Sequence, residues 1–286
     1  VKEITLDANA LQTNVSTMTF KTVRDAMKFI ESCNTPSSEE ERVTLNFKKG
    51  TYREQIFVNA PYLTFKNADT TDYKDVVLTW YYGIGYKYYS IGEDGFYNKD
   101  LARENKLTDN YTAPAKNWGH TIRINATATG FKADNITFES SFNRYVTREE
   151  IEDGCVPVNI VLDKNKKVIN EEGLKFYKDG TGGTKPDRAS LGAGSTKVQE
   201  KDYRERSCAF FILADKAEMT GCYFVSEQDT LGTNYMRQYY KNCVIEGTVD
   251  YICGTGNSIF DNCELKWGTT ANASGGYVHA PKGNYL

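Results

Sequence analysis

The sequence contains few of the residues from which many hydrolases and metalloenzymes build their sites. Only two histidines occur among its 286 residues, His120 and His279, and no cysteines have the spacing of a metal-binding motif. Because histidine and cysteine supply most zinc ligands, a zinc site is not expected. A Gly-x-Ser-x-Gly segment is also absent, which argues against a Ser-His-Asp hydrolase. Carboxylate and amide side chains remain for any chemistry, and we expect no metal or other cofactor.

Long apolar runs and a strong charge bias are missing as well. No stretch approaches the roughly 20 apolar residues of a membrane-spanning helix. We find no signal peptide in the sequence, and its first residues resemble the start of a processed or trimmed chain. The net charge of −3 offers no basic surface for nucleic acid. We therefore predict a protein with neither membrane nor nucleic-acid partners, and a monomer.

Short strand-like runs repeat in the C-terminal part with steps of 21 and 20 residues. Each run has a cysteine and, two positions later, an apolar residue. These positions are Cys222 with Phe224, Cys243 with Ile245 and Cys263 with Leu265. Spacing by two is the period of a strand, and a repeat of this length without a helical pattern predicts one coil of a parallel β-helix. We interpret the cysteines as a stacked ladder of small apolar side chains, with disulfides between coils as the alternative.

An earlier run, residues 135–138, fits the same template. From Ile136 to Cys222 the sequence spans 86 residues, 65 more than one coil of 21. The excess predicts an insertion of roughly residues 141–205, with a hairpin over residues 158–169. We interpret the insertion as a long loop on a single domain that spans residues 1–286. The alternative is that the insertion forms a wall of a substrate cleft.

The N-terminal region has a different pattern. Apolar residues recur at helical spacing between Thr19 and Asn34, which predicts one amphipathic helix that covers the open end of the solenoid. Strands are predicted at Val43–Phe47, Gln55–Val58, Leu63–Phe65 and Val76–Trp80. Five tyrosines crowd the segment after Trp80, at positions 81, 82, 86, 88 and 89. Tyrosine rings suit sugars but are equally common in ordinary strands and loops.

Two aspartates within the repeat, Asp229 and Asp250, are 21 residues apart, the length of one coil. They should therefore lie side by side on stacked strands, roughly 4.8 Å apart. Two close carboxylates do not both ionise easily, so one is suited to act as an acid and the other as a base or nucleophile. The amide of Gln228 can donate to a developing oxyanion. The alternative is that both aspartates cap turns between coils.

Three segments resemble the motifs of the pectin methylesterases, the carbohydrate esterases that demethylate polygalacturonate. Residues 50–54 are similar to the family's Gly-x-Tyr-x-Glu motif, and residues 228–231 match its Gln-Asp-Thr-Leu motif. Residues 247–254 are similar to Gly-Thr-Val-Asp-Phe-Ile-Phe-Gly, with Tyr251 and Cys253 at two aromatic positions. The resemblance covers roughly residues 17–140 and 206–283. It implies a right-handed parallel β-helix, an all-β fold.

The resemblance also implies a role for each residue of the aspartate pair. Asp250 would attack the C6 methyl ester of a galacturonate residue, and Gln228 would stabilise the oxyanion. Asp229 would protonate the departing methanol and then activate water. The implied partner is methylated pectin, that is homogalacturonan, and the implied location is secreted or at the cell surface.

Two features depart from the family. Where the family has a second oxyanion glutamine, 22 residues before the first, this sequence has Arg206, which can also bind an oxyanion. We predict that Arg206, Thr230 and Tyr251 contact substrate. The family's Leu-Gly-Arg-Pro-Trp motif does not occur before Leu286, so we expect a C-terminally incomplete sequence that lacks further coils. A non-catalytic carbohydrate-binding β-helix is the main alternative, and a calcium-dependent pectate lyase is weaker.

Overall fold

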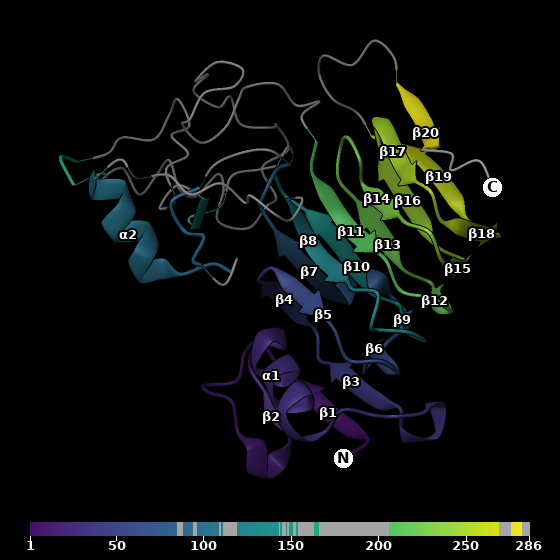
Figure 1. Ribbon diagram of the computed structural model, residues 1–286, viewed down its shortest axis with the longest axis horizontal. Helices are drawn as coiled ribbons and strands as arrows, with labels where there is room; N and C mark the ends of the chain where they lie inside the picture. The colour runs from purple at the N-terminus through teal and green to yellow at the C-terminus, as the bar shows by residue number, and fades with distance from the viewer. Residues whose placement is uncertain are drawn as a thin grey trace.

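The computed structural model shows strands that stack along one axis (Figure 1). It describes residues 1–84, 88–93, 96–108, 110, 119–142, 144, 147, 149–150, 153, 163–165, 206–268 and 276–281. The strands form three sheets of eight, six and six strands, and all pairings within these sheets are parallel. The predicted parallel β-helix is therefore confirmed.

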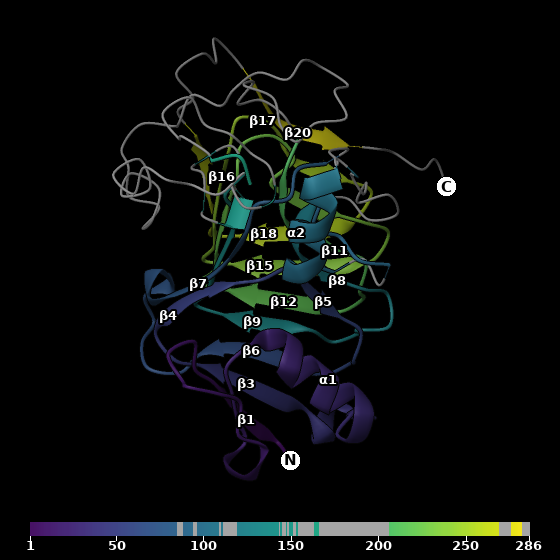
Figure 2. The same ribbon diagram turned by 90° about the vertical axis from the view of Figure 1, so that its left-hand side faces the viewer.

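Each full coil contributes one strand to each sheet. Sheet A contains β1 (Glu3–Leu6), β2 (Thr19–Phe20), β3 (Val43–Phe47), β6 (Leu63–Asn67), β9 (Lys132–Asp134), β12 (Ala217–Thr220), β15 (Arg237–Lys241) and β18 (Asn257–Asp261). Sheet B contains β4 (Gly50–Arg53), β7 (Val76–Trp80), β10 (Thr137–Ser140), β13 (Tyr223–Val225), β16 (Val244–Gly247) and β19 (Glu264–Trp267). Sheet C contains β5 (Ile56–Val58), β8 (His120–Ile124), β11 (Cys208–Ile212), β14 (Leu231–Thr233), β17 (Val249–Gly254) and β20 (Tyr277–Pro281). Figure 2 shows the strands of sheet A as successive rungs from β1 to β18.

The cysteine repeat predicts the register of sheet B correctly. Phe224 pairs with Ile245, which pairs with Leu265. The cysteines that precede these strands are free thiols, with Cys222 and Cys243 buried. The ladder interpretation is confirmed for these residues, because apolar side chains at one position of each coil stack into a continuous core.

A left-handed residue marks the corner between sheets A and B in four coils. These residues are Asn135, Gly221, Asn242 and Asn262, with φ of 56°, 62°, 52° and 53°. Glycine and asparagine adopt this conformation at the lowest cost. Gly221 is also required sterically, since a Cβ there would lie 2.3 Å from Oδ1 of Asn135. The side chain of Asn262 donates to Oδ1 of Asn242 at 2.7 Å and so ties one corner to the next.

The predicted N-terminal helix is α1 (Val23–Cys33). It begins later than the apolar pattern because Thr22 caps it, accepting a hydrogen bond from the Asp25 backbone at 3.1 Å. Its buried residues, among them Val23 and Ile30, join the core of the solenoid. The helix lies at the N-terminal end beside β1 and β2, as expected for a cover (Figure 1).

The segment between β7 and β8 differs from the sequence analysis. It contains α2 (Lys99–Thr108), which no pattern predicted and which lies outside the stack on the side of β7 and β8 (Figures 1 and 2). Three short 3-10 turns, η1 (Val15–Thr17), η2 (Glu39–Glu41) and η3 (Tyr73–Asp75), lie elsewhere in the N-terminal part.

The described tyrosines after Trp80, at positions 81, 82, 88 and 89, are packing residues rather than a sugar-binding surface. Tyr81, Tyr82 and Tyr88 are fully buried and form a small core with Trp80. The Tyr81 hydroxyl donates to the buried Asp153 carboxylate at 2.8 Å. Position 86 and most of the predicted insertion, including residues 158–162 and 166–169 of its hairpin, lie outside the described residues.

Candidate active site

The register places Asp229 and Asp250 at the same point of adjacent coils. Leu231 of β14 pairs with Ile252 of β17, and each aspartate lies two residues earlier. The backbone N–H of Asp229 donates to the carbonyl of Val249 at 3.1 Å. Both aspartates are left-handed, with φ of 61° and 50°, so the chain makes the same kink in both coils. The 21-residue spacing therefore predicts their adjacency correctly.

Asp229 lies in the drier surroundings of the two. Its side chain is buried, whereas Asp250 is half-buried. Burial, assisted by the nearby charge of Asp250, raises the pKa of Asp229 to about 6. The charge of Arg206 and a hydrogen bond with the side chain of Gln228 act in the opposite direction. In mildly acidic solution a large share of Asp229 is therefore protonated, as a general acid requires.

Gln228 and Arg206 lie beside the two aspartates, and together the four side chains form a polar group. Arg206 lies opposite Gln228 in a short parallel bridge between coils, and the Ser207 N–H donates to the Gln228 carbonyl at 3.0 Å. Arg206 is exposed and Gln228 is half-buried. A guanidinium and a primary amide thus lie next to the carboxylates, where both can donate to an anionic oxygen.

The other two predicted substrate contacts lie inside the coil. The hydroxyl of Thr230 donates to the Glu246 carbonyl at 3.0 Å, and its side chain is fully buried. Tyr251 is 2% exposed and packs in the main core. A Cβ at Gly247 would lie 2.3 Å from the Tyr251 Cβ and 2.6 Å from the Thr230 hydroxyl. Burial favours a structural role for Thr230 and Tyr251 over the predicted substrate contact.

Cys253 is a residue near the site for which the sequence analysis predicted no role. Its thiol is half-buried, and burial together with the charges of Asp229 and Asp250 raises its pKa to about 12. The thiol is therefore neutral at ordinary pH. Cys253 pairs with Gly232, which pairs with Phe211. Side chains alternate between the two faces of a strand, and the residues on either side of Phe211 face the core. Phe211, Gly232 and Cys253 therefore lie in a row on the outer face of sheet C.

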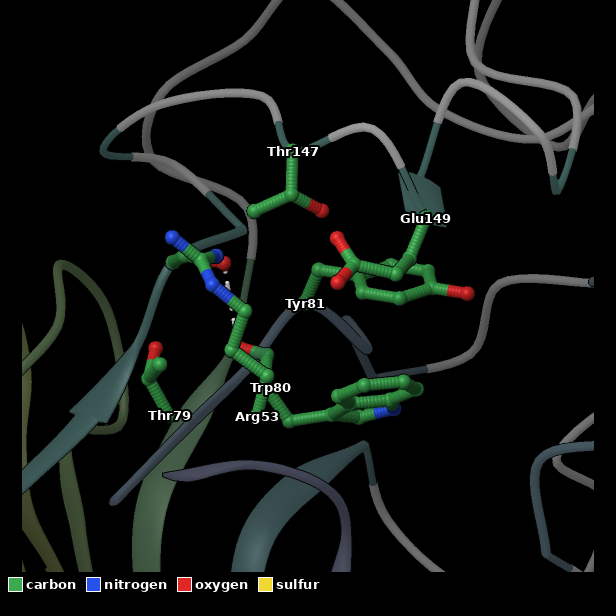
Figure 3. A pocket seen from close by; sticks show the side chains of 7 residues that line it. Arg53, Thr79, Trp80, Tyr81, Thr147 and Glu149 are labelled. Atoms are coloured by element: carbon green, nitrogen blue, oxygen red, sulfur yellow. Dashed lines mark hydrogen bonds between the residues drawn. The ribbon is translucent and has the colours of Figure 1, made fainter. Parts of the chain in front are cut away.

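A small hollow near β4 and β7 is separate from this group. Figure 3 shows Arg53, Thr79, Trp80, Tyr81, Thr147 and Glu149 around it. It has no room for even a water-sized molecule, so it is too small to hold a ligand. Among the described residues, no cluster of three or more histidine, cysteine, aspartate or glutamate side chains is arranged to hold a metal ion.

Residues 199–281, which contain both aspartates, match the family model described as Pectinesterase. The predicted resemblance to the pectinesterases is confirmed. A probable pectinesterase A of Neosartorya fischeri is 50% identical over 105 residues, which cover 36% of this chain and 28% of that protein. A pectinesterase of Petunia integrifolia is 38% identical over 76 residues, covering 27% of this chain and 20% of that protein. The matches thus cover less than a third of the length of these curated pectinesterases.

Solved pectin methylesterase structures share the fold. The enzyme PemA from Erwinia chrysanthemi has a TM-score of 0.61 and 19% identity, over 99% of this chain and 62% of that one. The enzyme from Yersinia enterocolitica has a TM-score of 0.55 and 20% identity, over 92% and 60%. At this identity the likeness concerns the fold, and the predicted right-handed parallel β-helix is confirmed. The chain spans about three fifths of these structures.

Proposed function

We propose that this chain acts as a pectin methylesterase, which hydrolyses the C6 methyl esters of polygalacturonate. The observation that carries the proposal is the adjacency of Asp229 and Asp250 within the segment that matches pectinesterases. The raised pKa of Asp229, about 6, supports a division of roles between an acid and a nucleophile.

In the first half of the reaction, a carboxylate oxygen of Asp250 attacks the ester carbonyl carbon. The carbonyl oxygen becomes an oxyanion that accepts hydrogen bonds from the Gln228 amide and the Arg206 guanidinium. When the tetrahedral intermediate collapses, the bond to the methoxy oxygen breaks. Asp229 gives its proton to that oxygen and methanol leaves, so that the acid group of the sugar is joined to Asp250 as an anhydride.

In the second half, Asp229 is a carboxylate and takes a proton from water. The resulting hydroxide attacks the acyl carbon, and the bond to Asp250 breaks. Asp250 returns as a carboxylate, Asp229 is protonated again and the sugar leaves as a uronic acid. One water is consumed and one methanol is released for each ester, with no change of oxidation state.

The proposed substrate is methylated homogalacturonan, and we propose a single catalytic domain that works as a monomer, secreted or at the cell surface. The names of the matching relatives support the substrate. None of the described helices has the length and apolar character needed to cross a membrane. The placement of Arg206 and Gln228 beside the aspartates supports a site that binds the acyl group of the ester.

The decisive measurement is methanol release from methylated pectin by the wild type, by Asp250→Ala and by Asp100→Asn. Asp100 is an exposed carboxylate of α2 far from the pair in sequence and serves as the matched control. Asp250→Ala should lose roughly 10⁴-fold or more of the rate, and Asp100→Asn should retain it. Ordinary methanol release by Asp250→Ala would contradict the proposal. Binding of polygalacturonate without methanol release by the wild type would identify a non-catalytic carbohydrate-binding protein instead.

A further inference from the structure

The turn that carries Gln228 and Asp229 lies next to the end of a much longer connection. Residues 226–230 join β13 to β14, whereas residues 141–207 join β10 to β11 in the preceding coil. A short turn is held in place by the strands on both sides of it. A connection as long as the second one does not fix the position of its last residues in this way. Arg206 lies at that end, so other contacts must hold it beside Gln228.

Two buried serines link the two connections. Ser207 and Ser226 are fully buried, and the Ser226 hydroxyl donates to the Ser207 carbonyl at 2.6 Å. The two hydroxyl oxygens also lie 2.6 Å apart. A serine hydroxyl has a single proton, and Ser226 gives its proton to the carbonyl, so Ser207 is the donor of the second bond. Both protons are thus used within the pair, which satisfies the two buried hydroxyls and ties one coil to the next.

Backbone hydrogen bonds on both sides of Arg206 complete this link. The Ser207 N–H donates to the Gln228 carbonyl at 3.0 Å. In the other direction, the Arg206 carbonyl accepts a hydrogen bond from the Ile84 N–H at 2.7 Å. The guanidinium itself is exposed. The position of the Arg206 backbone therefore determines where its charge is presented, and the serine pair acts on the very next residue.

The turn that carries Gln228 is also held from the following coil. The Glu227 carbonyl accepts a hydrogen bond from the Thr248 N–H at 2.8 Å. The Thr230 hydroxyl donates to the Glu246 carbonyl at 3.0 Å. Gln228 therefore keeps this support even if the contact with the preceding coil is weakened. The end of the long connection, in contrast, depends on the serine pair.

We propose that Ser207 and Ser226 are positioning residues, which hold Arg206 close enough to Gln228 for both side chains to donate to one oxyanion. The inference rests on the proposed function, in which that oxyanion forms from the ester carbonyl. Donors that are fixed before the charge develops stabilise it most. Both serines are enclosed and act through Arg206, and the oxyanion exists only after the attack. Their effect should therefore fall on kcat rather than on KM.

The test is methanol release by Ser226→Ala, alone and combined with Arg206→Ala. Ser226→Ala should lower kcat roughly 5- to 50-fold and leave KM within about twofold, because a displaced donor costs less than a missing one. In the Arg206→Ala background the same change should lower kcat less than about threefold, since no guanidinium remains to be positioned. Ser258→Ala is the matched control. Its hydroxyl donates to Oε1 of Gln238 at 2.9 Å on sheet A, and its loss should leave kcat unchanged.

A kcat of Ser226→Ala within twofold of the wild type would overturn the proposal. Equal losses with and without Arg206 would also overturn it, because a general loosening of the fold does not depend on the guanidinium. Rates are compared well below the melting temperature of every variant. If Ser226→Ala does not fold, Ser207→Ala takes its place. That variant keeps the bond to the Ser207 carbonyl and should show the same pattern with a smaller loss.

A second measurement does not require esterase activity. Burial raises the pKa of Asp229, and the positive charge of Arg206 opposes this rise. The charge of Asp250 also acts on Asp229, and Ser226→Ala leaves it unchanged. Carbon NMR titration of the Asp229 carboxyl should therefore give a higher pKa in Ser226→Ala than in the wild type.

The two measurements separate this inference from the proposed function. A higher pKa of Asp229 in Ser226→Ala, together with a wild type that releases no methanol, removes the esterase and leaves the positioning role. Normal methanol release by the wild type, together with an unchanged pKa in Ser226→Ala, removes the positioning role and leaves the esterase.

Discussion

Glu54 accepts hydrogen bonds from the first backbone N–H groups of α1, at 2.7 Å from Val23 and 2.8 Å from Arg24. The first turn of a helix has no acceptors of its own, so a carboxylate there is stabilising. Glu54 belongs to the Gly-x-Tyr-x-Glu segment, in which the Tyr52 hydroxyl donates to the Leu6 carbonyl at 2.8 Å. This motif therefore fastens α1 and β1 to the first coil, and in this protein its observed contacts are structural.

Removing that carboxylate should loosen the N-terminal end. Glu54→Ala should lower the free energy of unfolding by about 1–2 kcal/mol, since two helix N–H groups lose their acceptor. Glu54→Gln keeps one acceptor oxygen and should recover part of the loss. Urea unfolding followed by circular dichroism measures both. Glu264→Ala, at an exposed carboxylate of β19, is the matched control and should unfold like wild type.

The raised pKa of Asp229 predicts how activity depends on pH. Asp229 must carry a proton when methanol leaves, and its pKa is about 6. The rate of methanol release at low substrate should therefore fall as the pH rises through about 6. A rate that stays level from pH 5 to pH 8 would show that Asp229 is not the acid.

The same shift predicts a cost in stability at neutral pH. Folding raises the pKa of Asp229 from 3.8 to about 6, so the folded protein binds the proton more tightly. Its contribution is most favourable below pH 3.8 and is lost as the pH rises through 6. Between pH 5 and pH 8 the wild type should lose roughly 1–2 kcal/mol more than Asp229→Asn does. Equal losses in wild type and variant, measured by urea unfolding, would contradict this.

Arg206 offers a separate test of the same carboxyl group. Its positive charge lowers the pKa of Asp229. Arg206→Gln restores the residue type that the family resemblance implies, keeps a hydrogen-bond donor and removes the charge. The fall in methanol release should then move to higher pH. Arg206→Lys keeps the charge and should leave the profile in place, so an equal shift in both variants would exclude an electrostatic cause.

Gly232 should tolerate no side chain while Phe211 remains. A Cβ at Gly232 would lie 2.4 Å from Cδ2 of the Phe211 ring, so Gly232→Ala should lower the free energy of unfolding by about 1–3 kcal/mol. In the background of Phe211→Leu the same change should have a smaller effect, because the ring is gone. Thermal unfolding of the four proteins of this cycle gives the coupling directly. Additive effects would mean that the two side chains do not compete for space.

The coil and the position of the aspartates within it can be predicted from the amino-acid sequence alone. Cys222, Cys243 and Cys263 mark a 20–21-residue period, and a stack of parallel strands turns equal sequence position into spatial adjacency. Asp229 and Asp250 are adjacent because their spacing equals the length of one coil. The helix α1 is equally predictable from the sequence, because its buried face follows the helical period within one short segment.

Which side chains face outward and which are enclosed depends on how the coils pack in three dimensions. Thr230 and Tyr251 stand beside the aspartates in sequence but are enclosed by other parts of the fold, and Tyr81 is enclosed near Asp153. The raised pKa of Asp229 likewise depends on groups from several coils. Period and spacing are properties of neighbours along the chain. Burial and electrostatics are sums over neighbours in space, and no local pattern contains them.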